Sequence, residues 1–138
     1  IKAIQIGGPL GGVVPVDILR TLTLDFEVFS EGGFLLGHAS FVCIPQSFSA
    51  VEYAKHLFAF TAHESCGKCF PCRLGATRGK EMLESALEKD QKFSEELIND
   101  LLETMEVGSL CALGGGLPLA IKNLLEHCTD EFEPLMEK

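Results

Sequence analysis

Residues 64–73 read Glu-Ser-Cys-Gly-Lys-Cys-Phe-Pro-Cys-Arg and place Cys66, Cys69 and Cys72 in a C-x2-C-x2-C pattern. On a tight loop, three thiolates at this spacing can surround three corners of a cubane, and a [4Fe–4S] cluster takes four. Gly67 lets the backbone turn close to the cluster. Pro71 can open the next helix, whose first N–H groups would then face an anionic cluster. The run therefore predicts three ligands of an iron–sulfur cluster.

The fourth ligand has to come from another part of the chain, and the candidates are Cys111, Cys43 and Cys128. The bacterial ferredoxin pattern, with a further cysteine close behind the triplet, is absent. We favour Cys111, because it falls between two predicted helices and one helix down and one back would return it to the triplet. Cys43 and Cys128 lie in apolar stretches, which predicts buried, inert thiols.

The cysteines also allow two other interpretations, a zinc or redox site and a disulfide scaffold. A C-x2-C pair alone is also typical of a redox dithiol or of half a zinc site, and a third cysteine at the same spacing argues against both. Six cysteines in 138 residues would suit a disulfide-rich secreted scaffold, but the long apolar patterns can build a core without cross-links. A structural zinc module stays as the alternative.

The composition excludes several classes of function. The formal net charge is −9, which disfavours binding to nucleic acid, and hydrophobic residues make up 46% of the chain, enough for a core. No apolar run reaches the roughly 18 residues that a membrane span needs. The chain starts at Ile1 without a signal-peptide pattern, and we expect it to be cut from a longer protein.

A change of pattern near residue 48 divides the chain into a small α+β region, residues 1–47, and a helical region, residues 48–138. In the first region we expect a strand ending at Gly7, a short helical turn over residues 25–29 and a buried strand over residues 39–44. The glycine-rich residues 7–12 lack a phosphate-loop ending and predict a tight, close-packed turn.

Four helices are predicted in the second region. Ser49 with Glu52 forms a capping-box pattern, the second helix runs from about Cys72 to Lys89, Ser94 caps the third, and Pro118 lies in the first turn of the fourth. Residues 114–116 are expected to form a turn. Side chains expected in the core include Leu74, Leu97, Phe58, Phe60 and Phe70.

The cysteine motifs resemble a known family. Residues 64–73 closely resemble the E-S-C-G-x-C-x-P-C-R signature of the NADH-binding flavoprotein subunit of complex I, of NAD-reducing hydrogenase diaphorases and of the β subunit of NAD-dependent formate dehydrogenases. Residues 109–114 are similar to the family's S-L-C-x-L-G, which carries the fourth ligand. Residues 4–12 resemble part of its soluble-ligand-binding β-grasp (SLBB) domain.

The resemblance implies an incomplete β-grasp over residues 1–47 and a four-helix bundle over residues 48–138. It implies a [4Fe–4S] cluster on Cys66, Cys69, Cys72 and Cys111, which relays single electrons between FMN and downstream iron–sulfur centres. The family binds FMN and NAD(H) on a preceding domain whose motifs are absent here, so no catalytic residue is expected on this segment.

The implied partners are that FMN- and NADH-binding domain and the [2Fe–2S] and multi-cluster subunits of a parent complex. A cytoplasmic location is implied, including the cytoplasmic face of a membrane complex. Phe70 and residues 114–118 resemble the formate dehydrogenase branch more than complex I. An incomplete β-grasp would leave a sheet edge open to a second copy of the chain, and a β-grasp that binds a small ligand is the remaining alternative.

Overall fold

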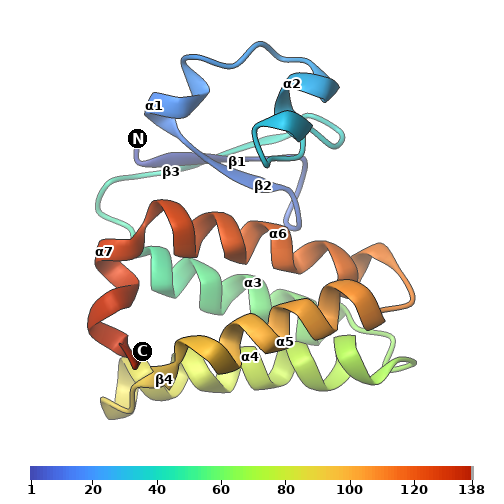
Figure 1. Cartoon of the computed structure of the whole chain (residues 1–138), viewed down its shortest axis with the longest axis vertical. Helices are drawn as coiled ribbons and strands as arrows, with labels where there is room; N and C mark the ends of the chain where they lie inside the picture. Colours follow the sequence, from blue (N-terminus) through green and yellow to red (C-terminus); the bar gives the residue numbers. More distant parts are fainter. Residues whose placement is uncertain (138) are drawn as a thin grey trace.

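The computed structural model describes residues 1–137 and places a small sheet on one side of a double layer of long helices, called the helical layer below (Figure 1). The sheet contains β1 (Ala3–Ile6), β2 (Gly12–Pro15) and β3 (Phe41–Ile44) in the order β2-β1-β3. Both pairings are antiparallel, with Ile4 opposite Val14 on one side and opposite Cys43 on the other. The predicted α+β class is confirmed.

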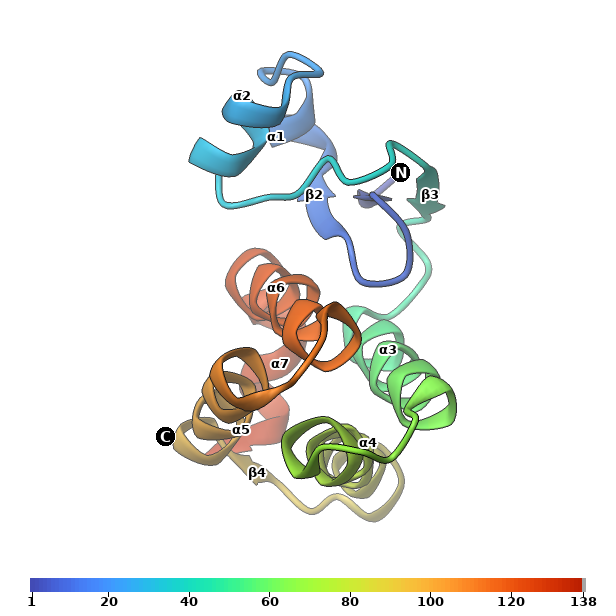
Figure 2. The same cartoon turned by 90° about the vertical axis from the view of Figure 1, so that its right-hand side faces the viewer.

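Two short helices cover the outer face of the sheet, α1 (Val16–Leu19) and α2 (Phe26–Glu31) (Figure 2). Asp25 caps α2 by accepting hydrogen bonds from two backbone N–H groups, which fixes the predicted helical turn at residues 25–29. The sequence did not indicate α1. Together these elements enclose a small apolar core of Ile6, Val14, Phe29, Phe34 and Leu36.

The helical layer contains α3 (Ala50–Glu64), α4 (Phe70–Lys89), α5 (Glu95–Gly108) and α6 (Ala112–His127). The predicted caps are confirmed, because Ser49 accepts from the N–H of Glu52 and Ser94 from that of Leu97. A short tail follows, with α7 (Thr129–Phe132), η1 (Glu133–Leu135) and β5 (Met136–Glu137), which pairs in parallel with β4 (Phe93–Ser94).

A second, larger core joins the helices to the inner face of the sheet. Helix α3 packs on α4 and α6, and α5 packs on α4 and α6. Ala3, Val13 and Ile44 of the sheet belong to the same core as Phe58 and Leu124 of the helices. Residues 1–137 include no helix with the length and apolarity needed to cross a bilayer.

The two edges of the sheet differ. At the β2 edge, Asn123 of α6 accepts from the N–H of Val13 at 3.1 Å and donates to the carbonyl of Gly33 at 3.1 Å. At the β3 edge, Gly7 N–H donates to Ser40 O, so by alternation along the ladder Phe41 and Cys43 direct their backbone groups away from β1. The predicted strand is confirmed as β3, but its predicted burial is wrong for residues 41–43, which are exposed on this edge strand, while Ile44 is buried.

Three further predictions for the helices are wrong. Helix α6 begins at Ala112, so residues 114–116 are helical and Pro118 lies inside the helix. Packing decides this start, since Gly114 and Leu117 are buried against the other helices. Phe70, Leu74 and Leu97 are exposed and not buried, with exposed fractions of 70%, 56% and 46%.

The glycine-rich turn after β1 is close-packed, as predicted. Gly7 and Gly8 both have positive φ, and a Cβ on Gly11 would lie 1.9 Å from the carbonyl oxygen of Ile6. Only glycine allows the chain to approach β1 this closely.

Candidate metal centre

Two cysteine loops lie at one end of the helical layer. The first, residues 65–69, joins α3 to α4, and the second, residues 109–111, joins α5 to α6. Both come at the end of the layer where α4 and α6 begin, which faces the viewer in Figure 2. Cys69 is the N-cap residue of α4 and Cys111 is the N-cap residue of α6. The N-terminal N–H groups of two helices are therefore directed to this end. The sequence predicted only one helix N-terminus here, that of the helix that begins near Pro71.

Three contacts join the two loops. The backbone N–H of Leu110 lies close enough to the Cys69 thiol to lower the pKa of that thiol. A Cβ on Gly108 would lie 2.9 Å from the ring of Pro71, and a Cβ on Gly114 would lie 2.6 Å from Cβ of Cys72. The structure thus brings the loop of Cys111 against the cysteine triplet. This agrees with the prediction that one helix down and one helix back would return the chain to the triplet.

The electrostatics of the first loop favour a thiolate at Cys69. The N–H of Leu110, followed by that of Cys72, lowers the pKa of the Cys69 thiol, because a hydrogen bond to sulfur stabilises its charged form. Lys68 and Arg73 are exposed beside it, and the Arg73 stem lies near Gly67, whose φ is +75°. Positive charge and backbone N–H groups together make this end suitable for an anionic group.

The four predicted ligands differ in exposure. Cys66 and Cys111 are exposed, Cys69 is half-buried, and Cys72 is buried, with 4% of its surface exposed. All are free thiols, which are soft donors suited to iron–sulfur chemistry. Within the described part of the chain, no three Cys, His, Asp or Glu side chains converge on one point that would hold a single metal ion.

The other two cysteines lie elsewhere. Cys43 is on the open edge strand β3, exposed and not buried as predicted. Cys128 ends α6, at the opposite end of that helix from Cys111, and burial raises the pKa of its thiol. Neither residue is close to the two cysteine loops.

Three residues of the site were not identified from the sequence: Ser65, Ser109 and Gly114. The hydroxyl of Ser65 lies 3.4 Å from Sγ of Cys72 and accepts from the N–H of Gly67. A Cβ on Gly114 would meet both the Ser109 hydroxyl, at 2.5 Å, and Cys72, at 2.6 Å. Their position close to cysteines in the two motifs could have indicated them from the sequence. Only the fold shows which thiol they approach.

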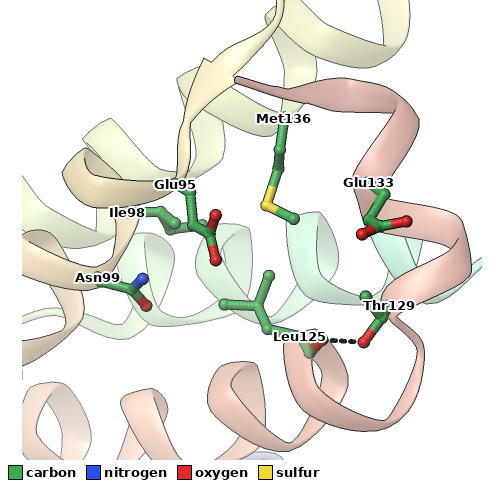
Figure 3. A pocket seen from close by; sticks show the side chains of 7 residues that line it. All are labelled: Glu95, Ile98, Asn99, Leu125, Thr129, Glu133 and Met136. Atoms are coloured by element: carbon green, nitrogen blue, oxygen red, sulfur yellow. Dashed lines mark hydrogen bonds between the residues drawn. The ribbon is translucent and has the colours of Figure 1, made fainter. Parts of the chain in front are cut away.

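A cavity of about 340 Å³ lies at the other end of the helices, between α5, α6 and the C-terminal tail (Figure 3). Glu95 and Met136 point into it, and Thr129 closes one side by bonding to the carbonyl of Leu125. It contains no thiol, and its carboxylates belong to exposed residues. The chemistry of this cavity is unrelated to that of the cysteine loops.

Comparison with known proteins gives consistent results. The family described as the NADH-ubiquinone oxidoreductase-F iron-sulfur binding region matches residues 52–135. The NADP-reducing hydrogenase subunit HndC of Solidesulfovibrio fructosivorans is 31% identical over 133 residues, 96% of this chain and 27% of that protein. The mitochondrial 51 kDa subunit of NADH-ubiquinone oxidoreductase from Neurospora crassa is 30% identical over 140 residues, 100% of this chain and 28% of that protein.

Among solved structures, an NAD+-reducing [NiFe]-hydrogenase in its H2-reduced state superposes with a TM-score of 0.82 at 26% identity. The match covers 99% of this chain and 23% of the hydrogenase chain. The chain spans between a quarter and a third of the length of the curated relatives it matches.

Proposed function

The chain belongs to the family of the NADH-ubiquinone oxidoreductase-F iron-sulfur binding region, and from this membership we propose that it relays single electrons through a [4Fe–4S] cluster. Cys66, Cys69, Cys72 and Cys111 are the proposed ligands. The observation that carries the proposal is the close approach of Gly114 to Cys72, where an added Cβ would lie 2.6 Å from Cβ of Cys72, because it places the loop of Cys111 against the cysteine triplet.

The residues present fit such a cluster. A cubane takes one thiolate on each iron, so its ligands surround it and do not meet at one point. Four free thiols, three of them in one C-x2-C-x2-C run, are the soft donors that such a cluster takes. When bound, the cluster supplies one-electron oxidation and reduction.

The chain itself holds and shields the group. The two N-terminal helix ends and the cations of Lys68 and Arg73 stabilise negative charge, which favours the reduced state. The buried Cys72 would shield a bound cluster from water, while the exposed Cys66 and Cys111 would leave it accessible to a partner.

We propose that FMN and NAD(H) bind to another domain of the same subunit, and that further iron–sulfur subunits accept the electrons. The names of the relatives, subunits of NADH-linked oxidoreductases and of a hydrogenase, support this placement. The parent complex is proposed to be cytoplasmic.

Three finer assignments are also proposals. We propose that residues 1–47 form an incomplete SLBB-type β-grasp, which the open edge of β3 supports, and that residues 48–138 form a four-helix bundle, which the packing of α3 to α6 supports. Phe70 and residues 114–118 support the formate dehydrogenase branch over complex I. Lys138 lies outside the described residues.

Anaerobic purification followed by iron and sulfide counting tests the proposed function. We expect about four iron and four sulfide per chain, with a broad visible absorption that bleaches on reduction. Cys111→Ser should lose most of the iron and sulfide, whereas the matched variant Cys43→Ser should retain both. A colourless, zinc-loaded protein would refute the proposal, and full cluster content in Cys111→Ser would refute the assignment of the fourth ligand.

A further inference from the structure

The hydroxyl of Ser109 has no partner in the protein. Within residues 1–137, Ser109 Oγ is the buried side-chain oxygen or nitrogen for which no hydrogen bond is found. The backbone N–H of Ser109 is satisfied, because it donates to the carbonyl of Met105 at 3.2 Å where α5 ends. Buried polar groups in proteins are almost always paired, so this hydroxyl requires an explanation.

The position of Ser109 supplies one. An ideal Cβ on Gly114 would lie 2.5 Å from Ser109 Oγ and 3.0 Å from Sγ of Cys72, so hydroxyl and thiol flank the same point. Ser65 approaches Cys72 from the first loop, with its hydroxyl 3.4 Å from the sulfur. The most buried of the four proposed ligands therefore has one serine from each cysteine loop beside it, and only the Ser109 hydroxyl is unpaired.

We propose that the Ser109 hydroxyl donates a hydrogen bond to sulfur at the Cys72 corner of the bound cluster and thereby raises the reduction potential. This inference rests on the proposed function. A serine has one O–H donor, and a cluster offers thiolate and sulfide acceptors. Reduction adds negative charge to those sulfurs, so a donor stabilises the reduced state more than the oxidised state.

A redox titration monitored by electron paramagnetic resonance (EPR) tests this on the anaerobically purified protein. In Ser109→Ala we expect unchanged iron and sulfide content and a lower potential, with the balance of oxidised and reduced cluster shifted up to about tenfold, or about 59 mV for one electron. Ser109→Thr keeps the hydroxyl and should restore the potential. Ser94→Ala removes a hydroxyl from the far end of the same helix and should titrate like the wild type.

Pulsed EPR of the reduced protein in D2O gives a second measurement that a purely structural role would not change. The wild type and Ser109→Thr should show coupling to an exchangeable deuteron that Ser109→Ala lacks.

The possible outcomes separate the two proposals. A wild type without a cluster overturns both. Equal potentials and equal deuteron couplings in wild type and Ser109→Ala overturn the role of Ser109 alone. If Ser109→Ala loses the cluster, Ser109→Thr decides: a retained cluster with the deuteron coupling supports the hydroxyl bond, and a lost cluster shows that Ser109 acts by its size and overturns it.

Discussion

The two cysteine loops contribute to one site in different ways. The first, residues 65–69, and the start of α4 that follows it carry most of the chemistry in their own sequence, since Cys66, Cys69 and Cys72 lie within seven positions. The second, residues 109–111, brings one cysteine and reaches the first through a backbone N–H and two glycines. Three of the proposed ligands are therefore close together in the sequence itself. The fourth reaches them only because α4 and α5 bring the chain back to the same end of the helices.

Gly114 provides the strongest test of that dependence. A Cβ at this position would lie within 3 Å of both Ser109 and Cys72, so Gly114→Ala has to push the loops apart. We expect a loss of about 1–3 kcal/mol in the free energy of unfolding, as for other overpacked sites, and a lower iron content. Denaturant unfolding and iron analysis measure the two effects.

Gly116→Ala is the matched control on the same helix, because its Cβ would meet only Leu10 at 3.7 Å. Removing a glycine from a helix at an uncrowded position should stabilise the protein by about 0.5–1 kcal/mol. Equal effects of the two variants would mean that the second loop is not held by close contact at Gly114.

The N-caps of the two helices that lead into the cysteine loops should contribute about equally to the stability of the protein. Ser94 caps α5 and Ser49 caps α3, and replacing either by alanine should cost about 1 kcal/mol in unfolding free energy. Iron content should stay at the wild-type level in both, because the caps lie at the far ends of the helices from the cysteines. Loss of iron in Ser94→Ala alone would show that the second loop depends on the whole of α5.

The smallest expected effect concerns the reactivity of Cys69 in the cluster-free protein. Its lowered pKa means that the thiolate is present at lower pH, so alkylation of Cys69 should begin at lower pH than that of Cys128, whose thiol pKa is raised by burial. Mass spectrometry of peptides labelled across a pH series measures both cysteines in one sample.

Leu110→Pro identifies the source of that shift. Proline removes the N–H that bonds the Cys69 thiol, so alkylation of Cys69 should move to higher pH. Leu110→Ala keeps the N–H and removes only an exposed side chain, and it should leave the profile in place. A shift of the same size in Leu110→Ala would contradict the assignment to the backbone.

Local signals in the sequence predicted local structure well. Ser49 and Ser94 were identified as caps because the cap and the N–H it accepts from lie three residues apart. The start of α6 was missed, since three glycines and Pro118 favour a turn by propensity and only packing against Cys72 and the core makes them helical. The sequence could not indicate that Ser109 and Cys72 share one side of Gly114.

Burial was the least predictable property. Phe70 and Leu74 sit at apolar helix positions, but they lie at the open end of α4, where no other element covers them. Cys43 has apolar neighbours, yet it is exposed on β3, an edge strand of the three-stranded sheet. Exposure at both places follows from the tertiary arrangement and not from the hydrophobic pattern.

Asn123 has a mechanical consequence. Its amide fastens the β2 edge to α6, and α6 begins directly after Cys111. A helix of this length is a stiff rod of about 24 Å. A displacement of the β2 edge would thus be transmitted along α6 towards the fourth cysteine, and Pro118 inside the helix is the position where α6 can bend.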